Sequence, residues 1–319
     1  MSRPALTPAQ RPDKRSSRRG AVSPWMALAV LALLALAAPL LLAACGAEET
    51  PTASDGTPAA TTTATPPATE TPAASPSPSE TAAGETTVLV YFLRGEELGT
   101  AERTLPQTVA VARAAMEALV GGPNADEKAA GLGTAIPKGT RLLGISVDGA
   151  VATVDLSGEF ASGGGSLSMT ARVAQVVYTM TQFKTIRAVA FMLDGERVAT
   201  IGGEGVIVDD PQRRADWQDF EPTIFVERPG VGATLSSPFV VQGRATVFEA
   251  TVNIDLLDAG EQALVETFTT ATMGAPGRGA FSKKIAYTSE SDSGWLVVYE
   301  ASAKDGSHLN EVRIPVSLL

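Results

Sequence analysis

The chain contains very few cysteine, histidine and aromatic residues. Its 319 residues include one cysteine and one histidine, and aromatic residues make up 5%. One cysteine excludes an intramolecular disulfide, and one histidine excludes a metal site built from several histidines. We interpret that histidine, His308, as an exposed residue of a turn. The scarcity of aromatic side chains argues against a surface that stacks nucleic-acid bases.

Positive charge is scarce in most of the chain. The sequence holds 25 Lys and Arg residues against 35 Asp and Glu residues, a formal net charge of −10. Six of the bases but only one acid lie in residues 1–45, so the rest of the chain has a net charge of −15. An acidic surface repels polyanions, which excludes nucleic acid as an expected partner.

An apolar segment near the start of the chain predicts export. Basic residues precede an uncharged run from Trp25 to Ala44. The end of this run and the residue after it form Leu42-Ala43-Ala44-Cys45. This order is typical of a secretory signal, and the last four residues resemble the bacterial lipobox, in which the cysteine is acylated. We therefore predict a lipoprotein signal peptide over residues 1–44 and an extracytoplasmic protein anchored in membrane lipid through Cys45.

Two alternatives remain open for this segment. The apolar run could span the bilayer uncleaved, and the basic flank would then keep the later residues on the same outer side. Ser17-Arg18-Arg19 suggests twin-arginine export, although Gly20-Ala21-Val22 fit that pattern poorly. Both the general secretory and the twin-arginine routes stay open.

Residues 45–85 predict a disordered tether. From Gly46 to Glu85 the sequence is dominated by Thr, Pro, Ala and Ser, with acids and no bases. Such a segment lacks the apolar side chains that offset the entropy of ordering. At ~3 Å per residue in an extended polyproline-like form, it could span at most about 120 Å. Its expected role is to hold the folded part away from the membrane.

Residues 86–208 predict an α+β domain. Apolar alternation and helical spacing place its elements in the order β-α-β-β-α-β, which favours one small sheet with two helices on one face. The predicted helix over 106–120 places Pro106 in its first turn. The predicted strands cover residues 87–93, 142–147, 151–156 and 186–193, and the second helix covers 167–183.

Several blocks of this region, in order, resemble one bacterial family. They are Leu119-Val120-Gly121-Gly122-Pro123, Thr134-Ala135-Ile136-Pro137-Lys138-Gly139-Thr140, Val154-Asp155-Leu156-Ser157-Gly158-Glu159-Phe160, Tyr178-Thr179-Met180-Thr181-Gln182-Phe183 and Phe191-Met192-Leu193-Asp194-Gly195. Together they resemble the GerMN domain of sporulation and spore-germination lipoproteins. The resemblance implies an interaction or scaffolding role, no catalytic machinery and no cofactor.

Residues 209–221 predict a charged, solvated linker, and residues 222–319 predict an all-β sandwich. Seven short alternating segments follow one another with Gly, Pro and Asp between them, as in sandwiches of the immunoglobulin type. The predicted strands are 224–227, 239–244, 251–257, 263–270, 279–285, 295–301 and 311–316. Within them, Trp295, Val297 and Tyr299 alternate, and we expect Trp295 to lie in the core.

The last part of the chain also resembles a known domain. The matching stretches are Ser237-Pro238-Phe239-Val240-Val241-Gln242-Gly243, Gly279-Ala280-Phe281, Ala301-Ser302-Ala303-Lys304-Asp305-Gly306 and Val312-Arg313-Ile314-Pro315-Val316. They resemble the immunoglobulin-like domain that accompanies GerMN domains in spore-germination proteins. The cysteines typical of antibody domains are missing, so the resemblance implies the architecture only.

Asp155 and Glu159 are the acidic residues that we single out as a possible ligand or cation contact. They lie four residues apart after a predicted strand, and paired carboxylates are what glycoside hydrolysis or cation binding needs. The intervening Leu156-Ser157-Gly158 indicates a turn, so a structural role is the main interpretation and a ligand or cation contact the alternative. No catalytic residue and no metal site is predicted.

Three classes of function follow from the sequence. The first is a non-enzymatic, membrane-anchored interaction or scaffolding module, with envelope proteins or further copies of itself as partners, in sporulation or germination. The second is binding of peptidoglycan or another carbohydrate, with Trp217, Trp295 and Tyr287 as the aromatic candidates. The third, a hydrolase, rests on Asp155 and Glu159 alone.

Overall fold

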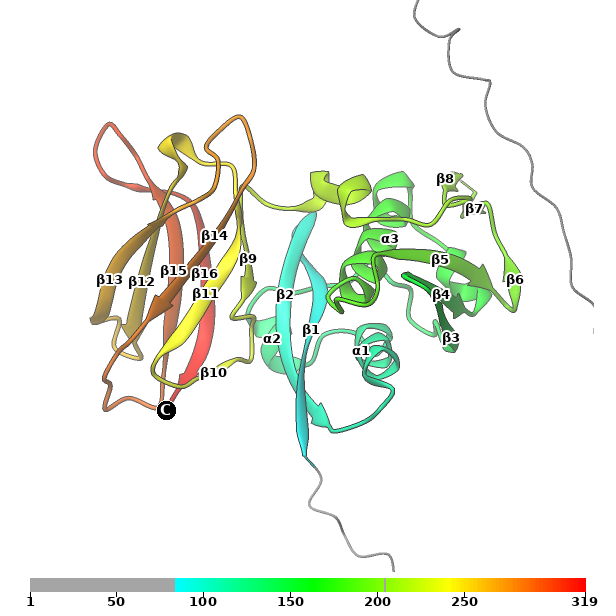
Figure 1. The fold of residues 1–319 in the computed structure, drawn as a ribbon, viewed down its shortest axis with the longest axis horizontal. Helices are drawn as coiled ribbons and strands as arrows, with labels where there is room; N and C mark the ends of the chain where they lie inside the picture. Colours follow the sequence, from blue (N-terminus) through cyan, green and yellow to red (C-terminus); the bar gives the residue numbers. More distant parts are fainter. Residues whose placement is uncertain (1–83, 204) are drawn as a thin grey trace, which may run out of the picture. The chain divides into compact units, whose positions relative to one another are not determined.

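The structure is a computed structural model that describes residues 84–203 and 205–319. The predicted signal peptide, Cys45 and nearly all of the predicted tether lie outside the described residues. Within the described part, no helix has the length and apolar character needed to cross a membrane. Figure 1 shows an N-terminal α+β domain followed by an all-β domain, as the sequence predicts.

The N-terminal domain begins with a β-hairpin. Strand β1 (Glu85–Arg94) pairs antiparallel with β2 (Glu97–Pro106), and the pairing runs from Glu85 opposite Pro106 to Arg94 opposite Glu97. Gly95 takes a positive φ of 67° in the two-residue connection, a conformation that glycine adopts without strain. All six residues from Val88 to Leu93 are buried. Strand β2 was not predicted, because its sequence ELGTAERTLP alternates only weakly.

Polar side chains in and just after one helix complete the backbone hydrogen bonding of strand β1. Helix α3 (Ser166–Met180) packs against β1, and its buried Gln175 and Thr179 bond to the backbone of Tyr91 at 3.1 and 3.2 Å. Gln182, just after the helix, exchanges two bonds with the backbone of Leu89. These side chains satisfy strand groups that would otherwise need a neighbouring strand. The hairpin therefore forms its own two-stranded sheet, and the predicted single sheet is wrong.

A four-stranded sheet carries the rest of the domain. Its order is β3-β4-β5-β6, with β4 and β5 parallel and connected through α3. Strand β3 forms one end of the sheet, and the pairing of β3 with β4 shifts between Leu142 and Gly144. The strands are β3 (Leu142–Asp148), β4 (Val151–Leu156), β5 (Ala188–Leu193) and β6 (Glu196–Arg197), followed by the separate pair β7 (Thr200–Ile201) and β8 (Val206–Ile207).

Two shorter helices lie between β2 and β3. Helix α1 (Val111–Val120) begins five residues after Pro106, which ends β2, so Pro106 is not in its first turn. Helix α2 (Ala125–Ala129) starts with a capping box in which Asn124 and Glu127 satisfy each other's backbone N–H groups. Glu127 is 1% exposed and accepts two bonds from Arg103, at 2.8 and 2.6 Å. This bidentate pair fixes α2 against β2.

The segment between the domains is solvated only in part. Residues Arg214–Phe220 form a 3-10 helix with a kink at Trp217. Trp217 is 8% exposed and Glu221 is 3% exposed. The backbone of Gln212 also bonds in both directions to Val189 of β5. The abundance of charged residues predicted solvation here, but these tertiary contacts bury the end of the segment.

The C-terminal domain is a sandwich of two sheets. The five-stranded sheet has the order β10-β16-β15-β12-β13, and the three-stranded sheet has the order β14-β11-β9. All seven predicted strands are present, and only the two-residue β10 was missed. The strands are β9 (Ile224–Arg228), β10 (Thr234–Leu235), β11 (Phe239–Ala245), β12 (Thr251–Asp258), β13 (Ala263–Thr270), β14 (Gly279–Ile285), β15 (Ser293–Ala301) and β16 (His308–Leu318).

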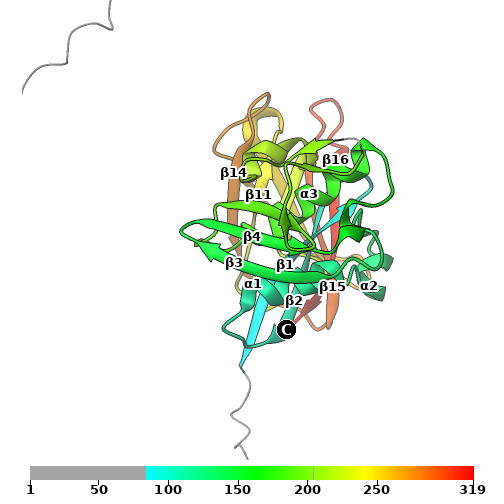
Figure 2. The ribbon, with the colours of Figure 1, turned by 90° about the vertical axis from the view of Figure 1, so that its right-hand side faces the viewer.

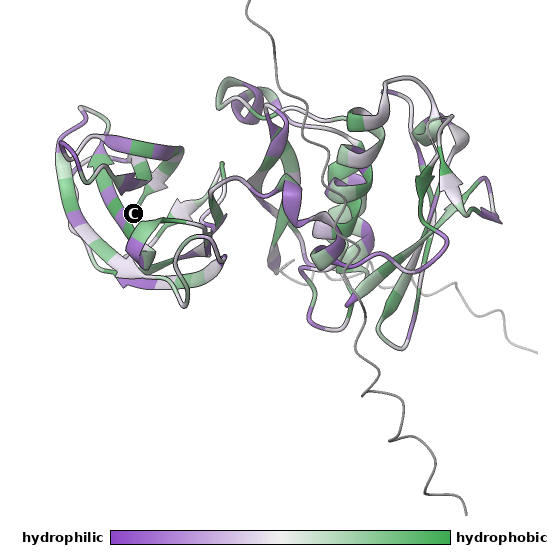
Figure 3. Ribbon diagram, turned by 90° about the horizontal axis from the view of Figure 1, so that it is seen from above, coloured by the Kyte–Doolittle hydropathy of each residue, from purple (hydrophilic) through white to green (hydrophobic). Residues whose placement is uncertain are grey.

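The core of the sandwich follows the alternation of its strands. Val252, Ile254 and Leu256 of β12 are fully buried, and hydrophobic residues line the strands in Figure 3. On β15 the prediction that Trp295 lies in the core is wrong by one position. Leu296 and Val298 lie in the core, whereas Trp295 is only half-buried. The run WLVVY is apolar at every position, so its pairing with β12, rather than its sequence, decides which side chains face inward.

Candidate functional site: the junction of the two domains

Backbone bonds join the two domains directly. Ala101 of β2 lies beside Val231 of the C-terminal domain in an isolated parallel bridge. Val231 donates to the carbonyl of Thr100 at 2.9 Å and accepts from the amide of Glu102 at 2.8 Å. The Thr100 hydroxyl donates to the carbonyl of Val226 at 3.0 Å. The hairpin β1–β2 therefore continues into the second domain through hydrogen bonds as well as packing.

Arg214 lies at the centre of an aromatic cluster at this junction. Its guanidinium lies 5.1 Å from the ring centroid of Tyr91 and 4.7 Å from that of Tyr178. It forms a short ion pair with Glu227 of β9 and donates to the Tyr91 hydroxyl at 2.9 Å. Phe225 completes the cluster, with ring centroids 6.1 and 6.0 Å from those of the two tyrosines.

The electrostatics of this cluster keep the tyrosines neutral. Burial raises the pKa of Tyr91 far above its ordinary value, and the Arg214 charge opposes that rise only in part. Burial also raises the pKa of Tyr178, with a further contribution from its bond to Glu221. Arg214 keeps its charge, since its interactions with Tyr91 and Glu227 raise its pKa and outweigh the effect of burial. The cluster is a permanent cation held between π faces and a carboxylate.

Glu221 is the most deeply buried charged group of the junction. Its side chain has no exposed surface, and it accepts a 2.6 Å bond from the Tyr178 hydroxyl. Arg244 and Arg278 of the C-terminal domain each approach one of its carboxylate oxygens at 3.3 Å. The Arg278 contact satisfies the distance of an ion pair but not the geometry of a hydrogen bond. Glu221 therefore connects α3 of the first domain with two cations of the second.

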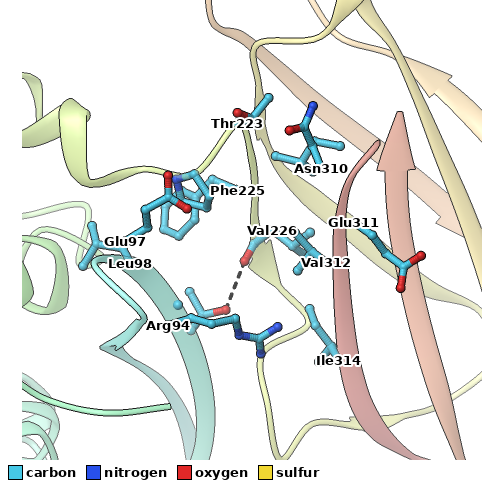
Figure 4. Close-up of a pocket in the computed structure, with 14 residues that line it drawn as sticks. Arg94, Glu97, Leu98, Thr223, Phe225, Val226, Asn310, Glu311, Val312 and Ile314 are labelled. Carbon is cyan, nitrogen blue, oxygen red and sulfur yellow. Dashed lines mark hydrogen bonds between the residues drawn. The ribbon is translucent and has the colours of Figure 1, made fainter. Parts of the chain in front are cut away.

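A pocket of about 280 Å³ opens beside this network, between β2, β9 and β16 (Figure 4). Arg94 lies in its wall, and its Nη1 donates to the carbonyl of Arg313 at 3.0 Å. Burial lowers the pKa of Arg94. The remaining walls mix apolar side chains with carboxylates at Glu97 and Glu311, and the described residues that line the pocket include no imidazole or thiol. The lining therefore provides a cation and two carboxylates but no nucleophile paired with an imidazole base.

Asp155 and Glu159 contact different groups in the structure. Asp155 accepts the amide N–H of Gly195 at 3.1 Å, and Asp194 accepts that of Gly158 at the same distance, so two turns brace each other. Glu159 is exposed and lies 4.0 Å from Arg141. A hydrogen bond from Ser157 lowers the pKa of Glu159, with smaller contributions from its own backbone N–H and from Arg141. Among the described residues no group of three potential metal ligands is found.

The aromatic candidates for sugar binding are mostly buried. Trp217 and Tyr287 are each 8% exposed, and the Tyr287 hydroxyl donates to the carbonyl of Leu235 at 2.7 Å. The half-buried ring of Trp295 is covered by the Arg313 guanidinium, 4.7 Å from its centroid. The prediction that these side chains could stack on a sugar is therefore wrong for Trp217 and Tyr287, which are buried. The third, Trp295, already stacks on a cation.

His308 is exposed as predicted, but it begins strand β16 rather than lying in a turn. Its Nδ1 lies 2.7 Å from the Glu311 carboxylate, and its ring stacks on Tyr299 with centroids 3.5 Å apart. The hydroxyl of Tyr299 in turn bonds to Asp255 on β12. Burial and the neighbouring Asp255 carboxylate raise the pKa of Tyr299 to about 12. The only histidine thus belongs to a polar cluster on the outer face of the five-stranded sheet.

This cluster predicts a loss of stability at alkaline pH. An unfolded tyrosine loses its proton near pH 10, whereas Tyr299 in the folded chain keeps it up to about pH 12. Its contribution is therefore complete below pH 10 and is lost as the pH rises from 10 to 12. Denaturation curves of wild type and Tyr299→Phe at pH 8 and pH 11 measure this. We expect the difference in stability between them to change with pH, and a constant difference would contradict the assignment.

The comparisons with known proteins now identify the two domains. Residues 89–199 match the family model Germane, described as sporulation and spore germination. Residues 223–307 match the family model Gmad2, described as the immunoglobulin-like domain of bacterial spore germination. The chain contains a Germane domain followed by a Gmad2 domain. Both resemblances expected from the sequence are confirmed, and neither family description names an enzymatic activity.

Solved structures give distant likenesses to parts of this chain. A crystal structure of a candidate lipoprotein from Clostridium perfringens is 20% identical, covers 43% of this chain and 93% of that chain, and has a TM-score of 0.32. The tandem GerMN domains of the sporulation protein GerM from Bacillus subtilis are 18% identical, cover 65% of this chain and 63% of that chain, and score 0.38.

The first GerMN domain of the same Bacillus subtilis protein is 24% identical, covers 40% of this chain and 99% of that chain, and has a TM-score of 0.34. Such identities and scores carry no functional information. Among curated proteins, none matches the chain.

Sequence reasoning did not find the junction between the two domains. Tyr91, Tyr178 and Arg214 are separated by dozens of residues and belong to no local motif. The one available signal was the density of charged residues at 209–221, which we interpreted as solvation. Buried Glu221 shows that some of those charges are instead paired across the junction.

Proposed function

We propose that this chain is a non-enzymatic, extracytoplasmic interaction module of the sporulation or germination type, anchored in a membrane by a lipid on Cys45. The observation that carries the proposal is the junction network. Arg214 and Glu221 connect the Germane and Gmad2 domains through ion pairs that are wholly or partly buried, and we expect the two domains to bind partners as one unit. An adapter needs surfaces held in a fixed relation, whereas a tethered pair of independent domains would not provide it.

The two domain families support the same proposal. Both families are described as belonging to sporulation or spore germination, and the described residues that line the pocket at the junction include no nucleophile with an imidazole base. Envelope proteins are the expected partners. Crosslinking followed by mass spectrometry on intact cells that carry the full-length chain tests this. Recovery of defined envelope proteins supports an adapter, and recovery of wall fragments alone would favour the peptidoglycan-binding alternative.

The lipid anchor gives a separate prediction. Replacing Cys45 by serine removes the thiol that receives the diacylglyceryl group, so the chain should no longer incorporate a labelled fatty acid. Wild-type chain in the same cells should be labelled and recovered with the membrane fraction. Gel mobility distinguishes processed from unprocessed chain, because an uncleaved signal segment could also hold the variant in the membrane. Labelling of the serine variant would contradict acylation at Cys45.

A further inference from the structure

Strand β3 lies at the edge of its sheet, and the shift in its register between Leu142 and Gly144 is the one edge-protecting feature within residues 142–147. No strand pairs with its outer side in the described part of the chain (Figure 2). Exposed sheet edges normally carry charges or proline, which discourage pairing with another chain. The outer strand β14 carries Lys283 and Lys284, and the outer strand β13 carries Glu266. From residue 142 to residue 147, β3 reads LLGISV and has neither feature.

The apolar side of β3 is only partly covered. Ile145 and Val147 pair with Val154 and Ala152, so they lie on the face of the sheet that forms the core. Yet Val147 is 48% exposed, and a pocket of about 390 Å³ separates both residues from the start of α1. Val109, before that helix, is fully exposed beside the same pocket. The edge therefore combines free backbone groups with an apolar groove.

The charges at the two ends of β3 are self-complementary. Arg141 precedes the strand and Asp148 ends it, and Asp148 forms no ion pair with any described residue. If a second β3 lies antiparallel with Ile145 opposite itself, Leu143 lies opposite Val147 and Leu142 lies opposite Asp148. Arg141 then lies one position along the strand from Asp148 of the second copy, as a diagonal neighbour. The Arg141 side chain is 67% exposed and is available for this contact, since its one ion pair with a described residue, Glu159, is 4.0 Å long.

We propose that two copies of this chain associate by antiparallel pairing of their β3 edges, with Ile145 on the twofold axis. Such an interface is isologous, and it would join the two four-stranded sheets into one continuous sheet. The grooves of both copies would then share one apolar stripe formed by Ile145 and Val147. The inference rests on the proposed interaction role and names one of its partners as the chain itself. Membrane anchoring would favour it by raising the local concentration of copies.

Cysteine substitution tests the register directly. In the full-length chain, Ile145→Cys places two thiols opposite each other across the axis, at a spacing that a disulfide can close. We expect a disulfide dimer in isolated membranes treated with a mild oxidant. Ser146→Cys is the matched control on the same strand, because its opposite residue would be Gly144. Thr267→Cys on β13 and the unsubstituted chain control for random collision and for Cys45.

A charge exchange tests the pairing independently. Asp148→Arg alone should reduce the yield of the Ile145→Cys dimer about fivefold, because two like charges then lie at neighbouring positions at both ends of the interface. Arg141→Asp together with Asp148→Arg should restore the yield, since the exchanged pair is again complementary. Both residues are exposed, so folding should not change, and circular dichroism checks this.

Several outcomes would overturn the proposal. They are a dimer through Thr267→Cys as readily as through Ile145→Cys, a dimer through Ser146→Cys in place of Ile145→Cys, or no rescue by the double exchange. A disulfide from position 145 to another protein would assign the edge to a different partner. If Ile145→Cys fails to link while crosslinking still recovers envelope proteins, the β3 pairing is wrong and the adapter role stands.

Discussion

Replacing Glu221 by alanine is expected to lower the free energy of unfolding by about 3 kcal/mol. The variant leaves the Tyr178 hydroxyl without its acceptor at 2.6 Å and leaves Arg244 and Arg278 facing a buried void. The two arginine side chains are 30% and 20% exposed, so partial rehydration keeps the loss near the lower end for buried ion pairs. Chemical denaturation followed by tryptophan fluorescence measures the loss.

The same variant should also separate the two domains in unfolding. Glu221 bonds to α3 of the Germane domain and pairs with cations of the Gmad2 domain, so its loss weakens their coupling. We expect a single transition in wild type and two resolved transitions in Glu221→Ala.

Glu117→Ala is the matched control for a charge of the same kind. Its ion pair with Arg113 is exposed on the surface of α1, so its loss should cost less than about 0.5 kcal/mol. Equal losses in the two variants would mean that the buried network does not stabilise the fold.

Replacing Gly243 by alanine is expected to destabilise the Gmad2 domain by about 3 kcal/mol or to prevent its folding. A Cβ on Gly243 would lie 2.1 Å from the carbonyl oxygen of Phe225 and 2.9 Å from the ring of Phe281. The first contact is with backbone, so it can be relieved only by moving β9 away from β11 at the point where their pairing shifts register. Thermal unfolding of the variant measures the effect.

Gly144→Ala is the matched control, because Gly144 also lies in a strand where the register shifts. The nearest atom to its added Cβ is 3.8 Å away, an ordinary contact. We expect a change within about 0.5 kcal/mol in either direction. A loss at Gly144 as large as that at Gly243 would show that the cost arises from the strand conformation rather than from the close approach of Phe225.

The strands of the Gmad2 domain were predictable because they alternate. β12 buries Val252, Ile254 and Leu256 and leaves the residues between them partly exposed, so period-two patterning was sufficient. The pattern failed where every residue of a strand is apolar or aromatic, because it then does not show which face of the strand points inward. On β15 every residue from Trp295 to Tyr299 is apolar or aromatic, and only the pairing with β12 shows that Leu296 and Val298 face the core.

In the Germane domain the error concerned sheet membership rather than element type. The predicted strands and helices exist, but β1 completes its hydrogen bonding with Gln175, Thr179 and Gln182 instead of with β4 or β5. Sequence patterns predict which segments are strands. They do not show that polar side chains of a helix will replace a neighbouring strand.

The sequence by itself determined the domain types and the expectations of export and of a lipid anchor on Cys45. These depend on local composition, alternation and short motifs. Only the tertiary structure decided how the domains are joined. Tyr91 and Tyr178 lie far in the chain from each other and from Arg214 and Glu221, and each of the four is unremarkable in its local sequence. Packing places them within hydrogen-bonding distance in a buried space, where an ion pair needs all of its partners and where the loss of one is costly.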